Sequence, residues 1–331
     1  MSPKVTVLIP VYNRERFIDE AIRSVIDQDF QDFELLVVDD GSTDGTPDVL
    51  ASSKSRDARI VVVTSPVNQG IPAALNLGLA HARGTYVARL DSDDLMVPRR
   101  LAEQAAVLDA HPEVVLVSCA YDIVDLAGKH AGRWKRDEPP AVTAFLLRFF
   151  NVVGGGGQVM FRTADVMAEG GYALDYQTSE DYELWVRLLR RGRIETLPFV
   201  GMIKRTHAEQ SNVRWRHIKR EKWTSIMRAA LQPYLRRSVN EEEIAALITM
   251  WRYDGRAGMG SIADRVMREA FARFRSEVAD RKLQACARRK IARQWYIAAR
   301  YFLSDGQPIE AMRYFARAAR WLLTPRSDAT A

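Results

Sequence analysis

The sequence predicts an α/β protein built on a mostly parallel mixed sheet flanked by helices, followed by an α-helical C-terminal region. In the first half of the chain, short runs rich in β-branched residues alternate with stretches of helical periodicity. Further along, the apolar pattern is helical, with no convincing strand. Alternating strands and helices are typical of βαβ units, whose strands lie parallel in one sheet.

The individual elements follow from apolar spacing. Segments 17–26, 73–82 and 99–110 repeat apolar residues at helical intervals, and the last of them follows Pro98, a residue favoured at helix starts. The helices fill the gaps between short apolar runs that we interpret as strands. These runs are residues 5–9, 35–38, 60–63, 86–90 and 114–117.

The change of pattern predicts two domains. We expect a sheet-containing domain over residues 1–215 and a basic helical region over residues 216–331, since single cores rarely grow beyond about 250 to 300 residues. Within the helical region, small and aromatic residues of segment 295–325 are spaced as in one tetratricopeptide-type helical hairpin.

The net charge of +6 is distributed unevenly along the chain. Residues 1–199 hold 21 Lys and Arg against 29 Asp and Glu, whereas residues 200–331 hold 27 against 13. A basic region favours anionic lipid head groups or nucleic acid, although the solvated faces of arginine-rich helices would give the same charge. We expect peripheral contact with a membrane through this region and no nucleic-acid partner.

Cysteine content and hydropathy bear on the compartment. Cys119 and Cys286 are far apart and form no CxxC motif, which fits a reducing environment. The apolar run at residues 5–11 is too short for a signal-peptide core and contains Pro10, and no stretch approaches the roughly 20 apolar residues of a membrane helix. We therefore expect a cytoplasmic protein, peripheral on the cytoplasmic face of the membrane if it contacts lipid.

Polar residues follow three of the predicted strands. In parallel sheets, ligands bind outside the carboxyl ends of the strands, so these residues are candidate site residues. Clustered carboxylates repel one another unless a divalent cation neutralises them, which predicts Mg²⁺ or Mn²⁺ here. An Asx-turn or a helix-capping cluster would use the same residue types. The residues are Pro10, Tyr12 and Asn13; Asp39 and Asp40; and Asp91, Ser92, Asp93 and Asp94.

Two further segments carry candidate groups. Glu180 and Asp181 begin a helix whose apolar face includes Trp185, where acids could also simply complement the helix dipole. Arg205 and His207 offer a cation and an imidazole for phosphate or metal. The glycine run 154–157 would allow backbone to lie against a ligand, or would form a flexible loop.

With these motifs in order, the sequence resembles the inverting glycosyltransferases of family 2, which have the nucleotide-diphospho-sugar transferase (GT-A) fold. The resemblance covers residues 4–212. It rests on VTVLIPVYN at 5–13, DDGSTD at 39–44, NQG at 68–70, DSDD at 91–94, GGY at 170–172 and EDYEL at 180–184.

The resemblance implies a role for each matching residue. Asp181 matches the general base that deprotonates the acceptor hydroxyl, and Asp91 and Asp93 match the DxD pair that meets the ribose and the metal, Mn²⁺ or Mg²⁺. His207 matches a further metal position. Residues matched to substrate binding are Pro10, Tyr12, Asn13, Asp39, Asp40, Asn68, Gly70, Asp91, Ser92, Glu180 and Arg205.

The resemblance also implies the partners: a nucleotide-sugar donor, most often a UDP-sugar, and a saccharide or glycolipid acceptor in polysaccharide, lipopolysaccharide or other glycoconjugate synthesis. Processive relatives carry a QxxRW motif, whereas residues 210–215 have one residue too many between Gln and Arg. We therefore expect transfer of one or few sugars. The alternatives are a nucleotidyltransferase and a non-catalytic nucleotide-sugar-binding protein. A dinucleotide-dependent oxidoreductase would need a GxGxxG turn after the first strand, which is absent.

Overall fold

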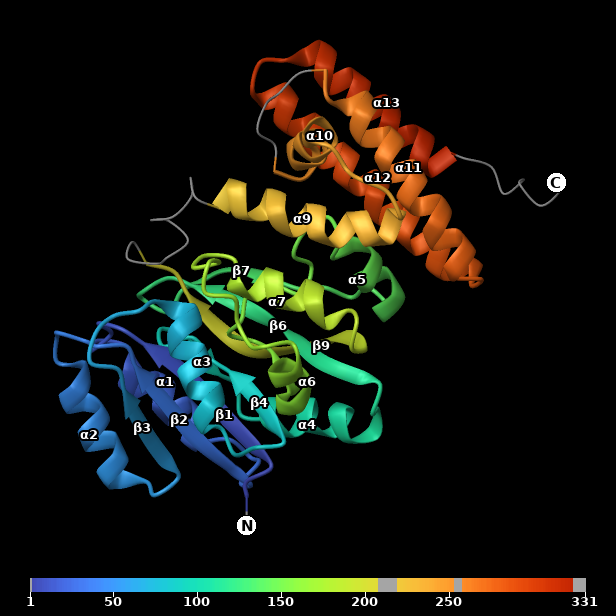
Figure 1. The fold of residues 1–331 in the computed structure, drawn as a ribbon. Coiled ribbons are helices and arrows are strands. Elements are labelled where there is room, and N and C mark those ends of the chain that lie inside the picture. The colour runs from blue at the N-terminus through green and yellow to red at the C-terminus, as the bar shows by residue number, and fades with distance from the viewer. Residues whose placement is uncertain (1, 208–218, 253–257, 324–331) are drawn as a thin grey trace. The chain divides into compact units, whose positions relative to one another are not determined.

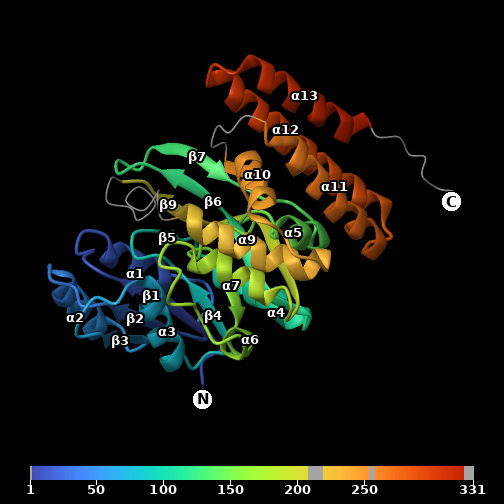
Figure 2. The same cartoon turned by 45° about the horizontal axis from the view of Figure 1, so that its top comes forward.

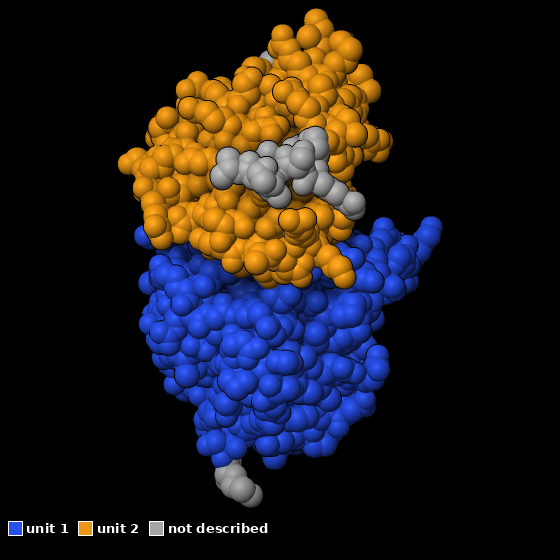
Figure 3. Space-filling model, turned by 90° about the vertical axis from the view of Figure 1, so that its right-hand side faces the viewer, with its two compact units in different colours: residues 1–140, 152–219 blue, residues 141–151, 220–331 orange. Residues whose placement is uncertain are grey.

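The computed structural model describes residues 2–207, 219–252 and 258–323. The chain divides into two compact units, coloured separately in Figure 3. The first comprises residues 1–140 and 152–219, and the second comprises residues 141–151 and 220–331. The segment 210–215 discussed above lies outside the described residues.

The first unit is built on one sheet, which in the described part of the chain has nine strands in the order β3-β2-β1-β4-β8-β6-β9-β5, with β7 paired to β6. Strands β1 to β4 pair in parallel, and β8 is antiparallel to both its neighbours, so β6 and β9 run in the same direction as β1. In chain order the strands are β1 (Val5–Val11), β2 (Phe33–Asp39), β3 (Ile60–Thr64), β4 (Tyr86–Arg89), β5 (Leu95–Met96), β6 (Val114–Val124), β7 (His130–Trp134), β8 (Met160–Arg162) and β9 (Arg193–Arg205).

Helices cover both faces of this sheet (Figures 1 and 2). Ile22 of α1, Leu50 of α2 and Leu101 of α4 belong to one apolar cluster with alternate residues of β1 and β2. On the other face, α3 packs on β1 and β2, and Trp185 of α7 contacts Phe161 of β8 with a ring separation of 6.3 Å. The helices are α1 (Ile18–Ile26), α2 (Thr46–Arg56), α3 (Ile71–His81), α4 (Arg100–Ala110), α6 (Thr163–Ala168) and α7 (Glu180–Leu188).

The central strands form because their residues suit burial on both faces. All residues of β2, with sequence FELLVVD, are buried, as expected for a parallel strand with helices on either side. The five predicted strands overlap β1, β2, β3, β4 and β6, and the predicted fold class is confirmed.

In its described residues the second unit consists of helices joined by short turns and loops. Helix α5 (Pro140–Leu146) belongs to it from residue 141 onward, although the chain places this helix between strands of the first unit. Phe145 packs among Tyr234, Phe271 and Phe274, with ring centroids 4.9 to 6.5 Å away. The remaining helices are α9 (Lys219–Leu235), α10 (Glu241–Arg252), α11 (Gly260–Glu277), α12 (Arg281–Ser304) and α13 (Pro308–Leu323).

The last two helices form a hairpin closed by a turn at Gly306, whose φ is +74° (Figure 2). Asp280 caps α12 by accepting from the backbone N–H of Lys282 at 2.7 Å. Trp295 and Tyr314 pack between the helices with ring centroids 5.0 Å apart. Among the described helices, none combines the length and the apolar content that crossing a bilayer requires.

Candidate active site

The carboxyl ends of β1 and β2 are tied together by short polar side chains. Asn13 has a φ of +53°, a left-handed conformation that asparagine tolerates better than most residues. Its Oδ1 accepts from the Thr43 N–H at 2.8 Å, and its own N–H donates to Ser42 Oγ at 3.0 Å. The end of the first strand therefore fixes the turn after the second, and Tyr12 is left 40% exposed beside it.

Both aspartates of that turn are buried and accept from backbone groups. Asp39 Oδ1 accepts from the backbone N–H of Ser42, three residues further on, at 3.0 Å. The Asp40 carboxylate accepts from the N–H groups of Gln69 at 3.0 Å and Gly70 at 2.7 Å. Asp40 thus holds the loop at the start of α3, which contains the exposed Asn68.

Gly70 is required where it stands. Its φ is +91°, and a Cβ there would lie 2.1 Å from Gln177 Oε1 in the loop before α7. The absence of a side chain at position 70 therefore brings the loop after β3 close to the segment that leads into Glu180 and Asp181.

Two of the expected metal ligands lie in direct contact. His207 Nε2 and Asp93 Oδ2 are 2.9 Å apart, and the imidazole is buried and stacked on Phe17 at 4.9 Å. Arg14, which follows Asn13, places its Nε 3.8 Å from the same Asp93 oxygen. Within the described residues, no three acidic, histidine or cysteine side chains are grouped closely enough to hold a metal ion by themselves.

The Asp93–His207 pair nonetheless fits a divalent cation of the Mn²⁺ or Mg²⁺ type. Such ions take oxygen ligands, with imidazole acceptable to transition metals, and usually keep waters and substrate phosphates in their coordination shell. Two protein ligands beside a diphosphate are therefore a sufficient protein contribution.

Arg89 connects the acidic cluster to the start of α7. It is buried at the end of β4, with Nη2 3.1 Å from Asp91 Oδ1 and Nη1 3.1 Å from Glu180 Oε1. Burial opposes its charge, but Asp91 and Glu180 together raise the pKa of Arg89. Burial likewise opposes ionisation of Asp91, but Arg89 and Lys204 lower the pKa of that carboxyl. Asp91 is therefore ionised at neutral pH.

Asp94 and Lys204 lie beside each other next to the cluster. Asp94 is fully buried, accepts from Arg205 N at 3.0 Å and lies 4.0 Å from Lys204 Nζ. Burial raises the pKa of Asp94 to about 8, opposed by Lys204. Burial works against the charged ammonium of Lys204, but Asp94 and Asp91 outweigh it and raise its pKa.

Arg205 is used to hold the site together. Its Nε donates to the carbonyl of Asp93 at 2.6 Å, its Nη1 pairs with Glu20 of α1, and its Nη2 donates to the carbonyl of Phe17 at 3.4 Å. These contacts tie the end of β9 to α1 and to the loop after β4. Lys204, the preceding residue, is the cation of this strand whose charge acts on Asp91 and Asp94.

Glu180 and Asp181 occupy the first turn of α7 in different surroundings. Glu180 is buried against Arg89, and burial raises the pKa of its carboxyl to about 7, with Arg89 opposing and Asp181 adding to the rise. Asp181 is half-buried, and its Oδ1 accepts from Tyr182 N at 2.6 Å. Both the catalytic interpretation of Asp181 and its helix-dipole alternative are compatible with this geometry.

Sequence reasoning missed three cations that organise the site: Arg14, Arg89 and Arg100. Arg100 is fully buried at the start of α4 and donates to the carbonyls of Gly157 at 2.7 Å and Arg89 at 2.8 Å. For Arg89 a signal existed, because a charged residue inside an otherwise apolar strand must find a partner when the strand is buried.

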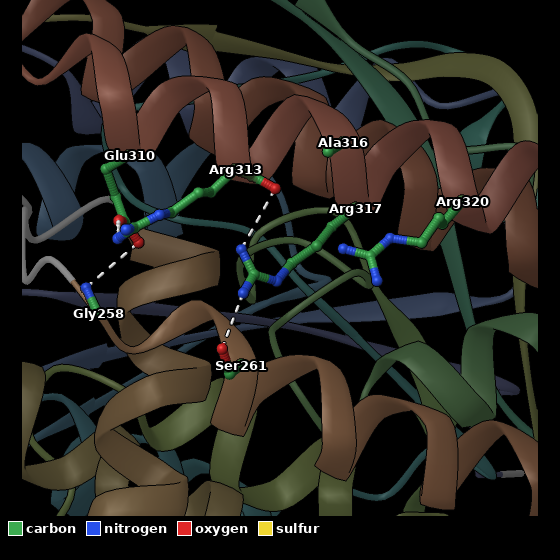
Figure 4. Close-up of a pocket in the computed structure, with 7 residues that line it drawn as sticks. All are labelled: Gly258, Ser261, Glu310, Arg313, Ala316, Arg317 and Arg320. Atoms are coloured by element: carbon green, nitrogen blue, oxygen red, sulfur yellow. Dashed lines mark hydrogen bonds and ion pairs between the residues drawn. The ribbon is translucent and has the colours of Figure 1, made fainter.

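A separate hollow of about 240 Å³ lies in the helical unit (Figure 4). Arg313, Arg317 and Arg320 of α13 point toward it, and Ser261 at the start of α11 accepts from Arg317 Nη2 at 2.9 Å. Glu310 pairs with Arg313 at 3.1 Å and accepts from Gly258 N at 3.2 Å. The hollow is therefore basic in character.

Comparisons with known proteins identify the family. Residues 6–165 match the family model described as glycosyl transferase family 2. The chain is 34% identical over 195 residues to the putative glycosyltransferase EpsE of Bacillus subtilis, covering 58% of this chain and 68% of that protein. It is 31% identical over 234 residues to the amylovoran biosynthesis glycosyltransferase AmsE of Erwinia amylovora, covering 69% of this chain and 86% of that protein.

Solved structures agree in fold. Residues 1–349 of S. aureus TarS, crystallised with UDP-GlcNAc, align with a TM-score of 0.60 at 18% identity, covering 96% of this chain and 91% of that chain. The mannosyltransferase PcManGT of Pyrobaculum calidifontis, in complex with GDP-Man and Mn²⁺, aligns with a TM-score of 0.53 at 20% identity, covering 98% and 89%. The chain belongs to glycosyltransferase family 2 and is a glycosyltransferase, as the sequence motifs predict.

Proposed function

We propose that this family 2 glycosyltransferase moves a sugar from a UDP-sugar to a hydroxyl of a saccharide or glycolipid acceptor during synthesis of a cell-surface polysaccharide, lipopolysaccharide or other glycoconjugate. The observation that carries the proposal is the position of Arg89, which contacts Asp91 of the acidic cluster and Glu180 of the α7 turn. The two groups of acids that the chemistry needs therefore belong to one site. UDP as the donor nucleotide is supported by the similarity to TarS, which was crystallised with UDP-GlcNAc, and the role in sugar-polymer synthesis by the similarity to AmsE, a glycosyltransferase of amylovoran biosynthesis.

The donor nucleotide is assigned to the ends of β1 and β2. We assign Asp40 and Asp39 to contacts with the base and the ribose. Asn13 fixes the turn that contains them, and the exposed Tyr12 lies beside this turn. Because Asp40 already accepts from two backbone N–H groups, its remaining lone pairs are the ones available to a ligand. Pro10, Asn68, Gly70 and Ser92 complete this assignment as neighbours of the same edge.

Asp93 and His207 would hold Mn²⁺ or Mg²⁺, with Asp91 directed to the ribose and the bound ion. When bound, such an ion supplies charge stabilisation to the departing nucleoside diphosphate. Lys204 adds a half-buried positive charge at the same place, and Arg205 keeps the Asp93 loop and β9 together. These residues orient the leaving group and exclude water from it.

Asp181 is assigned as the general base. It accepts the proton of the acceptor hydroxyl while the hydroxyl oxygen forms a bond to the anomeric carbon. The bond from that carbon to the diphosphate oxygen breaks at the same time, and the nucleoside diphosphate leaves with the electron pair, so the anomeric configuration inverts. Glu180 is less suited to this role because it is buried and already paired with Arg89.

The basic hollow on α13 and α11 supports the membrane part of the proposal. Three arginines directed at one hollow offer several donors to phosphate groups, as anionic lipid head groups require. We place the enzyme in the cytoplasm, at the membrane face where a lipid-linked acceptor would be presented. Membership of a glycosyltransferase family does not favour the two alternatives, a nucleotidyltransferase and a non-catalytic nucleotide-sugar-binding protein.

The test is a screen of the purified protein against a panel of nucleotide sugars with Mn²⁺, in which released nucleoside diphosphate is measured. Release from at least one UDP-sugar, its loss in excess chelator and its recovery with added Mn²⁺ or Mg²⁺ are expected. Full turnover in excess chelator would contradict the metal assignment, and release from no donor would contradict the proposed reaction.

A further inference from the structure

Two aromatic side chains stack across the hairpin of β6 and β7. Tyr121 and Trp134 are opposite each other in the antiparallel register, with ring centroids 5.1 Å apart and an angle of 5° between the ring planes. Both side chains are half-buried. Arg136 lies 6.0 Å from the Trp134 ring centroid. Because the centroids of the two parallel rings are 5.1 Å apart, the rings are offset, and each leaves part of its face uncovered by the other.

The glycine run 154–157 connects this surface to the acidic cluster. A Cβ at Gly154 would lie 3.1 Å from two carbons of the Trp134 indole, and a Cβ at Gly157 would lie 3.1 Å from Asp91 Oδ2. Between them, a Cβ at Gly156 would lie 2.2 Å from the Arg89 guanidinium carbon. A side chain at Gly154, Gly156 or Gly157 would displace a neighbouring group, so the loop backbone lies close to the indole, the guanidinium and the carboxylate.

The length of the run limits the distance between the two. Three residues of extended chain span at most about 11 Å, so Trp134 and Asp91 are separated by little more than the loop that touches both. A saccharide of a few units held at Trp134 therefore reaches the acidic cluster.

Tyr121 shares its surroundings with the proposed chemistry. Burial raises the pKa of the Tyr121 hydroxyl, and the charges of Lys204, Asp94, Arg136 and Asp181 act on it. In the sheet, Tyr121 pairs with Met202 and Ile123 pairs with Lys204, so the aromatic pair and Lys204 lie on the same sheet face. The face of the hairpin is thus continuous with the site.

The position of the pair in the sheet distinguishes acceptor from donor. The turns assigned to the nucleotide follow β1 and β2, whereas β6 and β7 lie beyond β4 and β8 in the strand order. The aromatic pair is therefore separate from the turns assigned to the nucleotide, which leaves it to the acceptor saccharide.

We propose that Tyr121 and Trp134 form a stacking subsite for a pyranose ring of the acceptor saccharide. Sugar rings carry flat faces of C–H groups that pack against the negative face of an aromatic ring, and ligand pockets combine such apolar walls with a few placed polar groups. The subsite rests on the proposed function, which makes a saccharide the acceptor, and adds where that acceptor binds.

The direct test uses simple sugars as probes. Saturation-transfer NMR is recorded with methyl glycosides of glucose, galactose, mannose and N-acetylglucosamine, in the presence of UDP and Mn²⁺. Ring protons of at least one glycoside should receive saturation from the wild type, and binding should weaken about tenfold in Trp134→Leu, which removes the aromatic face but keeps an apolar side chain at Gly154. Trp134→Phe should retain the signal. Tyr296→Ala, which removes an exposed aromatic ring of the helical unit, is the matched control.

The second experiment measures enzyme kinetics with a nucleotide sugar that the enzyme uses as a donor. Loss of a sugar platform should raise the acceptor KM more than it lowers kcat, so the ratio of sugar transfer to donor hydrolysis should fall about tenfold in both Trp134→Leu and Tyr121→Leu. UDP affinity measured by calorimetry checks that each variant is folded. Equal glycoside binding by wild type and Trp134→Leu, or no binding of any glycoside by wild type, would overturn the subsite. Glycoside binding that depends on Trp134 in a protein that cleaves no UDP-sugar would instead overturn the proposed function and leave the subsite standing.

Discussion

Arg89 sets the charges of the acids around it. Arg89 is a buried arginine with two carboxylate partners, and its charge keeps Asp91 ionised. Burial of Glu180 and the charge of Asp181 together raise the pKa of Glu180 to about 7. Two neighbouring acids of one motif, Glu180 and Asp181, therefore have different surroundings. The buried Glu180 is paired with Arg89, and the half-buried Asp181 is the one that we propose as the general base.

Asp181→Asn separates the catalytic interpretation from the capping one, because it removes the charge and keeps the shape. A carboxylate that only complements a helix dipole contributes at most about 1 kcal/mol of stability, and its loss would leave turnover nearly unchanged. General-base catalysis contributes about a hundred- to ten-thousand-fold, so the rate constant of sugar transfer should fall by that order. Donor affinity, measured by calorimetry at fixed Mn²⁺, should be retained.

Glu180→Gln is the control for that experiment, since it changes the adjacent carboxyl of the same helical turn. Its effect on transfer should be milder than that of Asp181→Asn. Should Asp181→Asn keep more than about a tenth of wild-type transfer, the assignment of the base would be wrong.

Glu180 also makes folding stability depend on pH. A carboxyl whose folded pKa, about 7, exceeds its ordinary value of 4.5 binds its proton more tightly in the folded state. Its contribution to the free energy of unfolding is therefore fully present below pH 4.5 and is lost as pH rises through 7. Relative to Glu180→Gln, the ligand-free wild type should lose on the order of 2 to 3 kcal/mol across this window. Parallel stability profiles of the two proteins in urea, measured from pH 4.5 to 7.5, would show that the shift is absent.

Single residues also show where sequence reasoning stops. The strand-end acids could be predicted because a strand's end and the carboxylates that follow it are visible in sequence. The contacts of Arg205 could not, since Glu20 and Asp93 lie far from it along the chain and meet it only where β9, α1 and the loop after β4 come together in the fold.

At the scale of elements, the predicted strands are the buried parallel ones, and those missed are β5, β7, β8 and β9. β5 and β8 span only Leu95–Met96 and Met160–Arg162, too short for a periodicity to appear. β9 contains Pro198 and Gly201, which argue against a strand in sequence. The structure accommodates Pro198 in a register shift, where Leu197 pairs with Cys119 and Val200 with Ala120.

Helix α4 depends on a buried arginine at its start. Arg100 forms four hydrogen bonds, to Gln104 Oε1 and to the carbonyls of Gly157, Arg89 and Val159. Burial lowers its pKa, so the charge is costly and the hydrogen bonds must offset it. Arg100→Met keeps the stem but leaves buried acceptors without a donor, and it should lower the free energy of unfolding by about 3 kcal/mol.

The neighbouring Arg99→Met provides a matched control for that measurement. Arg99 is exposed and pairs with Glu103 at 3.7 Å, and such surface pairs contribute at most about 1 kcal/mol. Urea unfolding of both variants decides the matter: equal losses would mean that the hydrogen bonds of Arg100 do not hold α4 to the sheet.

At the scale of the whole molecule, the helical unit includes a segment that lies, in the sequence, between the two parts of the sheet-containing unit. Phe145 and Phe149 come from residues 141–151, yet Phe145 packs against Tyr234 and Phe149 packs against Trp251. An apolar stretch such as 144–153 is visible in sequence, but its partners lie about a hundred residues later, where neither spacing nor propensity indicates them.

The uneven charge of the chain has a testable consequence at the same scale, because residues 200–331 carry 27 Lys and Arg against 13 Asp and Glu. Each basic side chain near an anionic lipid surface contributes about 1 kcal/mol, so replacing Arg313, Arg317 and Arg320 by Gln should weaken vesicle binding by about a hundred-fold. Co-sedimentation with phosphatidylglycerol vesicles at ~0.05 M salt measures this, and ~0.5 M salt should release the wild type because exposed charges are then screened. Phosphatidylcholine vesicles should not bind the protein.

A triple variant of Arg23, Arg99 and Arg190, which are exposed arginines of the sheet-containing unit, is the matched control. It removes the same charge and should bind like the wild type. If both triple variants lose binding equally, net charge alone governs the contact, and if the wild type does not sediment at low salt, the enzyme has no lipid-binding surface in its basic region.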